Sequence, residues 1–423
     1  MLQYSKMSKI NTLSQKRFVK KKKYQIDEHA VDSVVLKALL ISRGIKVSRE
    51  VYEKYQNKVR LSTDPLTCNS LSLPDGTVVQ LTDLSFHMDY MKSVVNWDML
   101  SQLRFLPQLK TDFLLQLDQD EKPILLYKNI ELTPVSFFPY TDFYSQSTAS
   151  GLPYKGNAVL QGKDWLSFQL LWKCDYALEG EPCQYCFSGG ELASLARRKK
   201  KLPIYPTPED VAEICEYSIL KEKCANSIQI TGGSSFDSRS EINRVVEMLT
   251  AIESRVGKKH ISGEIVAYIT PPKNKGDIDE IINAGVDKVS CSLEIWDEDL
   301  ASKIMPGKMK FTGRQRHLDC LLYIAEKYGK NKACCNFIIG LEPLASLLEG
   351  MEFMASHGII PIASVWIPFG RPVLGSMKTP TINYFQVVEK ELARIYRKYG
   401  IIPPGKQGLN VCFCRDVYVK NCC

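Results

Sequence analysis

The chain has 423 residues, of which 44% are hydrophobic and 24% are charged, a composition typical of a folded soluble protein. No apolar run approaches the roughly 20 residues that a membrane-spanning helix needs, and the first residues contain no apolar stretch of the kind found in secretory signals. These observations exclude membrane-embedded and low-complexity proteins, and we expect a cytoplasmic protein without membrane contact.

The net charge of +8 is confined to the start of the sequence. Residues 1–24 hold eight lysines and arginines and no acid, so residues 25–423 balance to zero. This pattern predicts a basic, flexible, solvated tail rather than a basic globular surface, and nucleic-acid binding is not expected. A second basic run, Arg197 to Lys201, predicts an exposed face before a helix.

Residues 25–150 contain both helix and strand patterns, with a helix expected at 27–44, a strand at 72–81 and a hairpin at 111–129. We predict a small α+β domain here, but it contains no motif that indicates its role. At the other end of the chain, residues 401–423 form a cysteine-rich tail.

From about residue 160 to residue 400, short apolar strands alternate with amphipathic helices. Thr207 and Pro208 open the first of these helices with a cap and a proline at the first helical position, and Gly257 ends the second. Strands are expected at 165–174, 227–233, 261–272, 288–296, 333–342 and 359–369, and helices at 207–223, 240–257, 276–285, 313–329, 344–358 and 381–400. This alternation predicts an α/β fold whose parallel sheet is either open or closed into a barrel. Both arrangements carry their sites at the C-terminal ends of the strands.

The loop after the first strand, "WKCDYALEGEPCQYCFSGG", contains three cysteines in the spacing Cys-x8-Cys-x2-Cys. They are Cys174, Cys183 and Cys186, with Tyr185 between the last two. Fourteen cysteines without an export signal argue against a disulfide framework, so clustered thiols favour a metal site. Structural zinc prefers a closed set of four ligands, whereas a [4Fe–4S] cluster on three cysteines keeps one iron open for another ligand.

This cysteine motif resembles that of the radical S-adenosylmethionine enzymes. In that family three cysteines follow the first strand of a partial (βα)6 TIM-type barrel and end in a Cys-x-aromatic-Cys pair. The first gap here is eight residues, where the commonest form of the family has three. The resemblance implies such a barrel at 160–400, a [4Fe–4S] cluster on Cys174, Cys183 and Cys186, and reductive cleavage of S-adenosyl-L-methionine to a 5′-deoxyadenosyl radical. It also implies hydrogen abstraction from a small-molecule or cofactor-precursor substrate, and a reductant protein such as a flavodoxin or ferredoxin.

Further segments resemble cofactor-binding segments of the same family, in the same order along the chain. "QITGGS" resembles the GGE motif, with Ser234 where the acid would stand, and Glu294 lies where family members bind the ribose. "NFIIGLEP" and "VWIPFGRP" resemble the segments near the adenine, and the set looks most like the branch around biotin synthase and the hydrogenase maturases. The cofactor-binding candidates are Tyr185, Gly232, Gly233, Ser234, Glu294, Gly340, Glu342 and Trp366.

Strand alternation gives candidates for substrate contact. If Glu294 faces the barrel interior, Ser290 and Ser292 face it too, and Cys291 points toward the helices. By the same parity, Glu342 brings Asn336 and Cys334 inward and sends Cys335 outward. Ser290, Ser292 and Asn336 are therefore either substrate contacts or satisfied polar residues of the barrel core.

The end of the chain, "NVCFCRDVYVKNCC", contains Cys412, Cys414, Cys422 and Cys423. The family resemblance makes an auxiliary iron–sulfur cluster, or a single iron or zinc, plausible at these thiols, and the alternative is a frayed terminus. Two other functions compete with the enzyme hypothesis for the chain as a whole. One is a zinc-stabilised binding module, and the other is a scaffold that delivers iron–sulfur clusters.

Overall fold

The computed structural model describes residues 22–56, 58–61, 69–81, 111–162, 164–171, 173–186, 206–366, 374, 377–406 and 412–423. The basic run at 197–201, and all of the basic tail before Lys22, lie outside these ranges. Tyr24, the last residue of the predicted tail, is buried in the first strand. No helix of the described residues has the length and apolar character needed to cross a bilayer.

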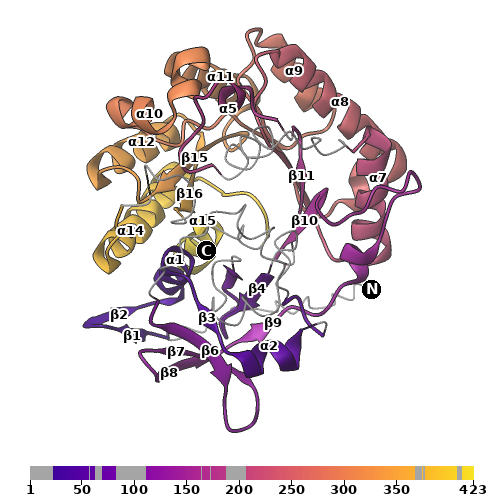
Figure 1. The fold of residues 1–423 in the computed structure, drawn as a ribbon. Coiled ribbons are helices and arrows are strands. Elements are labelled where there is room, and N and C mark those ends of the chain that lie inside the picture. Colours follow the sequence, from indigo (N-terminus) through magenta and orange to yellow (C-terminus); the bar gives the residue numbers. More distant parts are fainter. Residues whose placement is uncertain are drawn as a thin grey trace, which may run out of the picture.

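Seven strands form the main sheet, in the order β10-β11-β12-β13-β14-β15-β16. β10 pairs antiparallel with β11, and every later pair of neighbours is parallel. The strands are β10 (Ala158–Gln161), β11 (Trp165–Gln169), β12 (Ser227–Thr231), β13 (Ile265–Tyr268), β14 (Lys288–Ser290), β15 (Ala333–Ile339) and β16 (Ile360–Val365). The sheet curls around a common interior, and β16 does not pair with β10 (Figure 1). The predicted partial TIM-type barrel with its six parallel strands is confirmed, and β10 adds an antiparallel edge that the sequence did not indicate.

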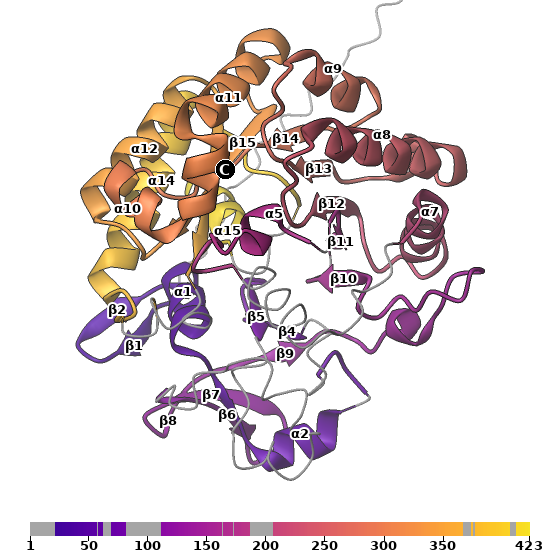
Figure 2. The same cartoon turned by 45° about the horizontal axis from the view of Figure 1, so that its top comes forward.

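Helices cover the outer face of this sheet, with α7, α8 and α9 along one flank and α10, α11, α12 and α14 along the other (Figures 1 and 2). Their bounds are α7 (Pro208–Glu216), α8 (Ser238–Arg255), α9 (Gly276–Asn283), α10 (Glu298–Ile304), α11 (Arg314–Tyr328), α12 (Leu344–Ser356) and α14 (Ile382–Tyr399). Thr207 caps α7 in a capping box with Asp210, and Pro208 stands in its first turn, as the sequence predicts. The core lies between helices and sheet, where strand residues such as Ile230 and Phe337 are fully buried.

The N-terminal part lies to one side of the barrel in both views (Figure 2). It contains a hairpin, a three-stranded sheet β5-β4-β9 and a four-stranded sheet β3-β6-β7-β8. Its elements are β1 (Tyr24–Ile26), β2 (His29–Val31), α1 (Ser33–Arg43), β3 (Lys46–Val47), α2 (Arg49–Tyr55), β4 (Asn69–Ser72), β5 (Val78–Leu81), β6 (Phe113–Leu117), β7 (Pro123–Tyr127), β8 (Ile130–Pro134), β9 (Ser136–Phe137) and the 3-10 turn η2 (Asp142–Ser145). The hairpin predicted at 111–129 is confirmed as β6 and β7, which pair antiparallel.

The helix predicted at 27–44 begins later than the sequence indicated. Asp32 caps α1, because its carboxylate accepts hydrogen bonds from the N–H groups of Val34 and Val35. The residues before it form the β1–β2 hairpin instead.

The C-terminal segment closes the barrel at the amino ends of its strands. The N–H groups of Gly405 and Lys406 donate to Glu264, just before β13, and to Asp164, just before β11, at 3.0 and 2.6 Å. Cys412 then forms an antiparallel bridge with Ser364 of β16 at the open edge of the sheet, and α15 (Cys414–Asn421) follows. The open end of the barrel is therefore the end at which the parallel strands finish.

Candidate active site

The three-cysteine loop is fastened to the loop that follows the neighbouring strand β12. The N–H of Asp175 donates to the carbonyl of Ser234 (2.8 Å), and the Asp175 carboxylate accepts from the N–H of Phe236 (2.8 Å) and the hydroxyl of Ser235 (3.2 Å). The N–H of Gly233 donates to the carbonyl of Leu171 at 2.9 Å. The loops after β11 and β12 therefore form one rigid unit at the open end of the barrel.

Two glycines allow this close approach. Gly232 has a φ of +155°, and a Cβ there would lie 2.8 Å from the backbone nitrogen of Leu171. A Cβ on Gly233 would overlap the carbonyl oxygen of Lys173 and lie 3.0 Å from the Cα of Cys174. Only glycine fits at either position, because the backbone that carries the first cysteine passes directly over both.

The far end of the cysteine loop rests on the segment after α10. The N–H of Gly307 donates to the carbonyl of Glu181 (3.0 Å), and the N–H of Gln184 donates to the carbonyl of Ile304 (2.8 Å). The hydroxyl of Tyr185 donates to the sulfur of Met305 at 3.3 Å, and its ring packs against an apolar cluster that includes Trp366. Both ends of the loop are thus held by elements of the barrel.

The three thiols of the loop are partly exposed. A short turn, closed by the N–H of Cys186 on the carbonyl of Cys183 (3.1 Å), carries the last two. Burial raises the pKa of the Cys183 thiol, while the nearby ammonium of Lys308 opposes this shift. Burial also raises the pKa of Cys174, and hydrogen bonds from the backbone of Ser234 and Ala177 oppose it. Across the described residues, no three His, Cys, Asp or Glu side chains stand close enough to hold a single metal ion.

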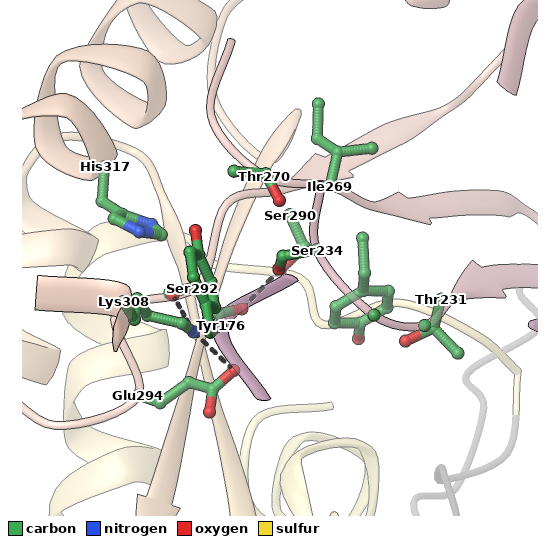
Figure 3. Close-up of a pocket in the computed structure, with 13 residues that line it drawn as sticks. Tyr176, Thr231, Ser234, Ile269, Thr270, Ser290, Ser292, Glu294, Lys308 and His317 are labelled. Carbon is green, nitrogen blue, oxygen red and sulfur yellow. Dashed lines mark hydrogen bonds and ion pairs between the residues drawn. The ribbon is translucent and has the colours of Figure 1, made fainter. Parts of the chain in front are cut away.

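A cavity of about 110 Å³, partly open to solvent, adjoins this loop (Figure 3). Its wall comes from the cysteine loop, from the ends of β12, β13 and β14, and from the helices after β14. The lining residues are Tyr176, Thr231, Gly232, Gly233, Ser234, Tyr268, Ile269, Thr270, Ser290, Ser292, Glu294, Lys308 and His317. The cavity therefore lies at the carboxyl ends of the strands, where barrels of this type carry their sites.

Glu294 and Lys308 form an ion pair in the cavity wall. The Lys308 ammonium lies 3.2 Å from the Glu294 carboxylate and donates to the carbonyl of Ser292 at 3.0 Å. Burial alone would lower the pKa of Lys308, but the Glu294 carboxylate and the Cys183 thiol outweigh it, so the pKa lies above its ordinary value. Glu294 also has a φ of +70°, a conformation that costs a non-glycine residue about 1 kcal/mol or more and is concentrated at functional sites.

Ser290 and Ser292 line the cavity together, and their hydroxyls lie 2.8 Å apart. Asn336 adjoins them, because its N–H donates to the Ser292 hydroxyl (3.0 Å) and its side-chain oxygen accepts from Ser364 (2.7 Å). Cys291 faces the helices, with its sulfur 3.2 Å from that of Cys320 on α11. Side-chain alternation along β14 and the residues after it therefore matches the parity derived from sequence.

Four of the cofactor-binding candidates lie outside the cavity lining, and Tyr185, described above, is one of them. The carboxylate of Glu342 accepts from the N–H groups of Trp296 (3.0 Å) and Asp297 (3.0 Å) and so supports the start of α10, while burial raises its pKa to about 7. Gly340 has a φ of +107° and packs against Pro380. Trp366 is buried, and its indole N–H has no hydrogen-bond partner among the described residues. The rest of its segment, 367–373, is outside those residues.

The structure brings two of the four C-terminal cysteines together and separates the other two from them. Cys412 accepts from the N–H of Cys414 at 3.1 Å, and the sulfur of Cys414 lies 2.8 Å from the backbone nitrogen of Ala363 in β16. Cys422 instead lies against the carbonyl of Ala393 on α14, and Cys423 is exposed. The auxiliary metal centre stays a prediction.

Sequence reasoning missed several side chains of the cavity wall, among them Tyr176, Lys308 and His317. Lys308 follows no periodic pattern, so no local signal marked it. His317 did carry a signal, because it shares the apolar face of α11 with Leu321 and Ile324, at helical spacing. A polar residue on a buried helix face requires a partner, and that requirement could have singled it out.

Comparisons with known proteins agree with this geometry. Residues 174–344 match the model of the Radical SAM superfamily. The bacteriochlorophyllide c C-7(1)-hydroxylase of Chlorobaculum limnaeum is 22% identical over 262 residues, which are 60% of this chain and 65% of that protein's length. The solved structures with similarity include methylornithine synthase (TM-score 0.40, 15% identity, 60% of this chain and 70% of that one). They also include coproporphyrinogen III oxidase from Escherichia coli (TM-score 0.34, 14% identity, 55% and 52%).

The matched segment begins at the first cysteine of the loop and contains all three thiols, both glycines and the Glu294–Lys308 pair. It also covers strands β12 to β15 of the partial barrel. Residues 174–344 of this chain are therefore similar to the radical SAM superfamily.

Proposed function

We propose that this protein is a radical SAM enzyme that binds a [4Fe–4S] cluster through Cys174, Cys183 and Cys186. Three thiols on one loop, fixed at both ends and beside an open cavity, suit a cluster that keeps one iron free. Such a cluster, once reduced by a flavodoxin- or ferredoxin-type protein, would supply the electron for reductive cleavage of S-adenosyl-L-methionine to a 5′-deoxyadenosyl radical, which would abstract hydrogen from a small-molecule substrate. The single observation that carries the proposal is the fastening of the cysteine loop to the glycine loop through Asp175 and Gly233.

The residues of the cavity wall have separate roles in this proposal. The backbone around Gly233 and Ser234 accommodates the amino-acid part of S-adenosyl-L-methionine, and Glu294 accepts hydrogen bonds from its ribose hydroxyls. The Lys308 ammonium pairs with the Glu294 carboxylate and holds it in place.

Anaerobic reconstitution tests the proposal. The wild-type protein is expected to hold about four irons per chain and, with a strong reductant, to convert S-adenosyl-L-methionine into 5′-deoxyadenosine and methionine. Each of Cys174→Ala, Cys183→Ala and Cys186→Ala is expected to lose the cluster and the activity. Cys215→Ala is the matched control, since that thiol is fully buried in α7.

The competing functions give different outcomes in the same experiment. Zinc in place of iron after anaerobic reconstitution would support a binding module and refute the enzyme. A cluster that transfers to an acceptor protein, without cleavage of S-adenosyl-L-methionine, would support a delivery scaffold instead.

A further inference from the structure

His317 lies in the cavity wall and is only 2% exposed. It projects from α11 toward the backbone that follows β14 (Figure 3). Its Nδ1 atom is 3.1 Å from the carbonyl oxygen of Cys291. A carbonyl oxygen can only accept, so Nδ1 carries the proton of this bond.

The other ring nitrogen of His317 has no partner. Burial, together with the nearby ammonium of Lys308, lowers the pKa of His317 to about 3, so the ring is neutral at physiological pH. With the proton on Nδ1, the Nε2 atom is a bare acceptor, and it makes no hydrogen bond within the described part of the chain. A buried acceptor without a donor is costly, which makes its occupation by a ligand favourable.

The neighbouring serines cannot supply that donor. Ser290 donates its hydroxyl proton to the carbonyl of Cys334 (3.1 Å), so the proton between the two serines belongs to Ser292. Both hydroxyl protons are thus used, and each oxygen offers only a lone pair to the cavity. His317, Ser290 and Ser292 together form a patch of wall that accepts hydrogen bonds and donates none.

We propose that His317 Nε2 binds an N–H or O–H group of the molecule in the cavity, and that this acceptor patch selects a ligand with a hydrogen-bond donor at that position. The inference rests on the proposed function, since it assumes that S-adenosyl-L-methionine and a substrate share the cavity. Both molecules are sources of such donors. His317 is a binding residue in either case.

Two substitutions of His317 test the contributions of its two ring nitrogens separately. His317→Asn keeps a donor where Nδ1 meets the Cys291 carbonyl and removes the acceptor. His317→Gln can reach the Nε2 position with its amide oxygen but gives up the Nδ1 position. His357→Asn is the matched control, because that exposed histidine also bonds a backbone carbonyl through Nδ1, that of Phe353 at 2.9 Å.

The experiment has two parts, and both use protein that has been reconstituted with its cluster. The first measures the dissociation constant of S-adenosyl-L-methionine by equilibrium dialysis. The second adds S-adenosyl-L-methionine, reductant and a low-molecular-mass metabolite extract from perdeuterated cells, and measures deuterium in the 5′-deoxyadenosine formed. Iron content and the melting temperature of each variant are measured alongside.

Weakening of cofactor binding by about tenfold in His317→Asn, with His317→Gln closer to wild type, assigns the donor to S-adenosyl-L-methionine. Unchanged cofactor binding, with deuterium transfer reduced about tenfold or more in His317→Asn alone, assigns it to the substrate. Wild-type behaviour of His317→Asn in both arms, or equal losses in both His317 variants, overturns the proposal. Absence of 5′-deoxyadenosine from the wild type would refute the proposed function instead. The dialysis measurement would still test whether His317 contributes to cofactor binding, because it does not depend on turnover.

Discussion

The ammonium of Lys308 lies 3.2 Å from the carboxylate of Glu294, with side chains only 11% and 17% exposed. We expect Lys308→Met to destabilise the fold by about 3 kcal/mol, because it leaves a largely buried carboxylate without its counter-charge. Affinity for S-adenosyl-L-methionine should fall in the same variant, since Glu294 loses the group that positions it. Chemical denaturation and equilibrium dialysis measure the two effects.

Lys310→Met is the control for this substitution, because it removes the same group from the same helical turn. Its partner is Glu181, and the two side chains are 60% and 32% exposed. Exposed pairs contribute less than about 1 kcal/mol. Equal losses of stability in the two variants would show that the Lys308–Glu294 pair is no stronger than a surface contact.

Gly233→Ala is expected to displace the cysteine loop. A Cβ at this position overlaps the carbonyl of Lys173 and meets the Cα of Cys174, so the backbone of the first cysteine has to move. Iron retained after reconstitution should fall severalfold, with helical content maintained. Gly276→Ala is the control, since its nearest neighbours are flexible side-chain atoms of Asn274 at 3.4 Å or more. Full iron retention in Gly233→Ala would contradict the tight fit between the two loops.

Glu241 gives a pH prediction. Burial raises its pKa to about 7, against hydrogen bonds from the N–H groups of Thr270 (2.6 Å) and Ser235 (3.2 Å). A carboxyl whose pKa is raised in the folded state stabilises the fold at pH values below its unfolded pKa of 4.5 and loses that contribution as the pH rises toward 7.

The free energy of unfolding of the wild type should therefore fall between pH 5 and 7, relative to Glu241→Gln, by on the order of 3 kcal/mol. Urea denaturation across this range measures the difference. Glu247→Gln, an exposed change on the same helix, is the comparison. If the free energy of unfolding depended on pH in the same way in the wild type and in Glu241→Gln, the pKa of Glu241 would lie near its ordinary value.

The C-terminal thiols give a test of the second metal centre. The contacts of Cys412 and Cys414 lie within the barrel wall, and Cys422 and Cys423 lie elsewhere. From these contacts we expect the double substitution of Cys422 and Cys423 by alanine to leave iron, zinc and sulfide per chain unchanged. A reproducible fall in metal, with the three-cysteine loop intact, would favour the auxiliary centre predicted from sequence.

Much of the barrel could be predicted from the sequence because its strands and helices differ in hydrophobic period. The helix caps at Thr207 and Thr381 also have the expected residue types. β10 could not be predicted in this way, because an antiparallel edge strand of four residues has no helix after it to mark its place. The true start of α1 was obscured because Asp27 and Glu28 have the acidic residue types of a first helical turn, whereas they lie at the turn of the β1–β2 hairpin.

The residues of the candidate site also fall into two groups, those that a sequence motif marks and those that only the fold brings to the cavity. Cys174, Gly233 and Glu294 were predicted because each stands at a fixed place in a motif. Lys308 and His317 reach the cavity from a helical turn and a helix that only tertiary packing brings there. Glu342 shows the converse, because its position in a motif indicated a ligand contact while its carboxylate bonds the backbone of residues 296 and 297.

The buried ion pair between Lys37 of α1 and Asp416 of α15, at 2.8 Å, joins positions 379 residues apart. Lys37 is fully buried, and its charge has this carboxylate beside it only when the C-terminal helix is in place. During synthesis, α1 leaves the ribosome long before α15 is made, so Lys37 lacks the carboxylate of Asp416 in the meantime. The contact between α1 and α15 therefore forms only after the barrel strands have been translated. A stalled or shortened product without α15 would expose the buried face of α1 to chaperones and proteases.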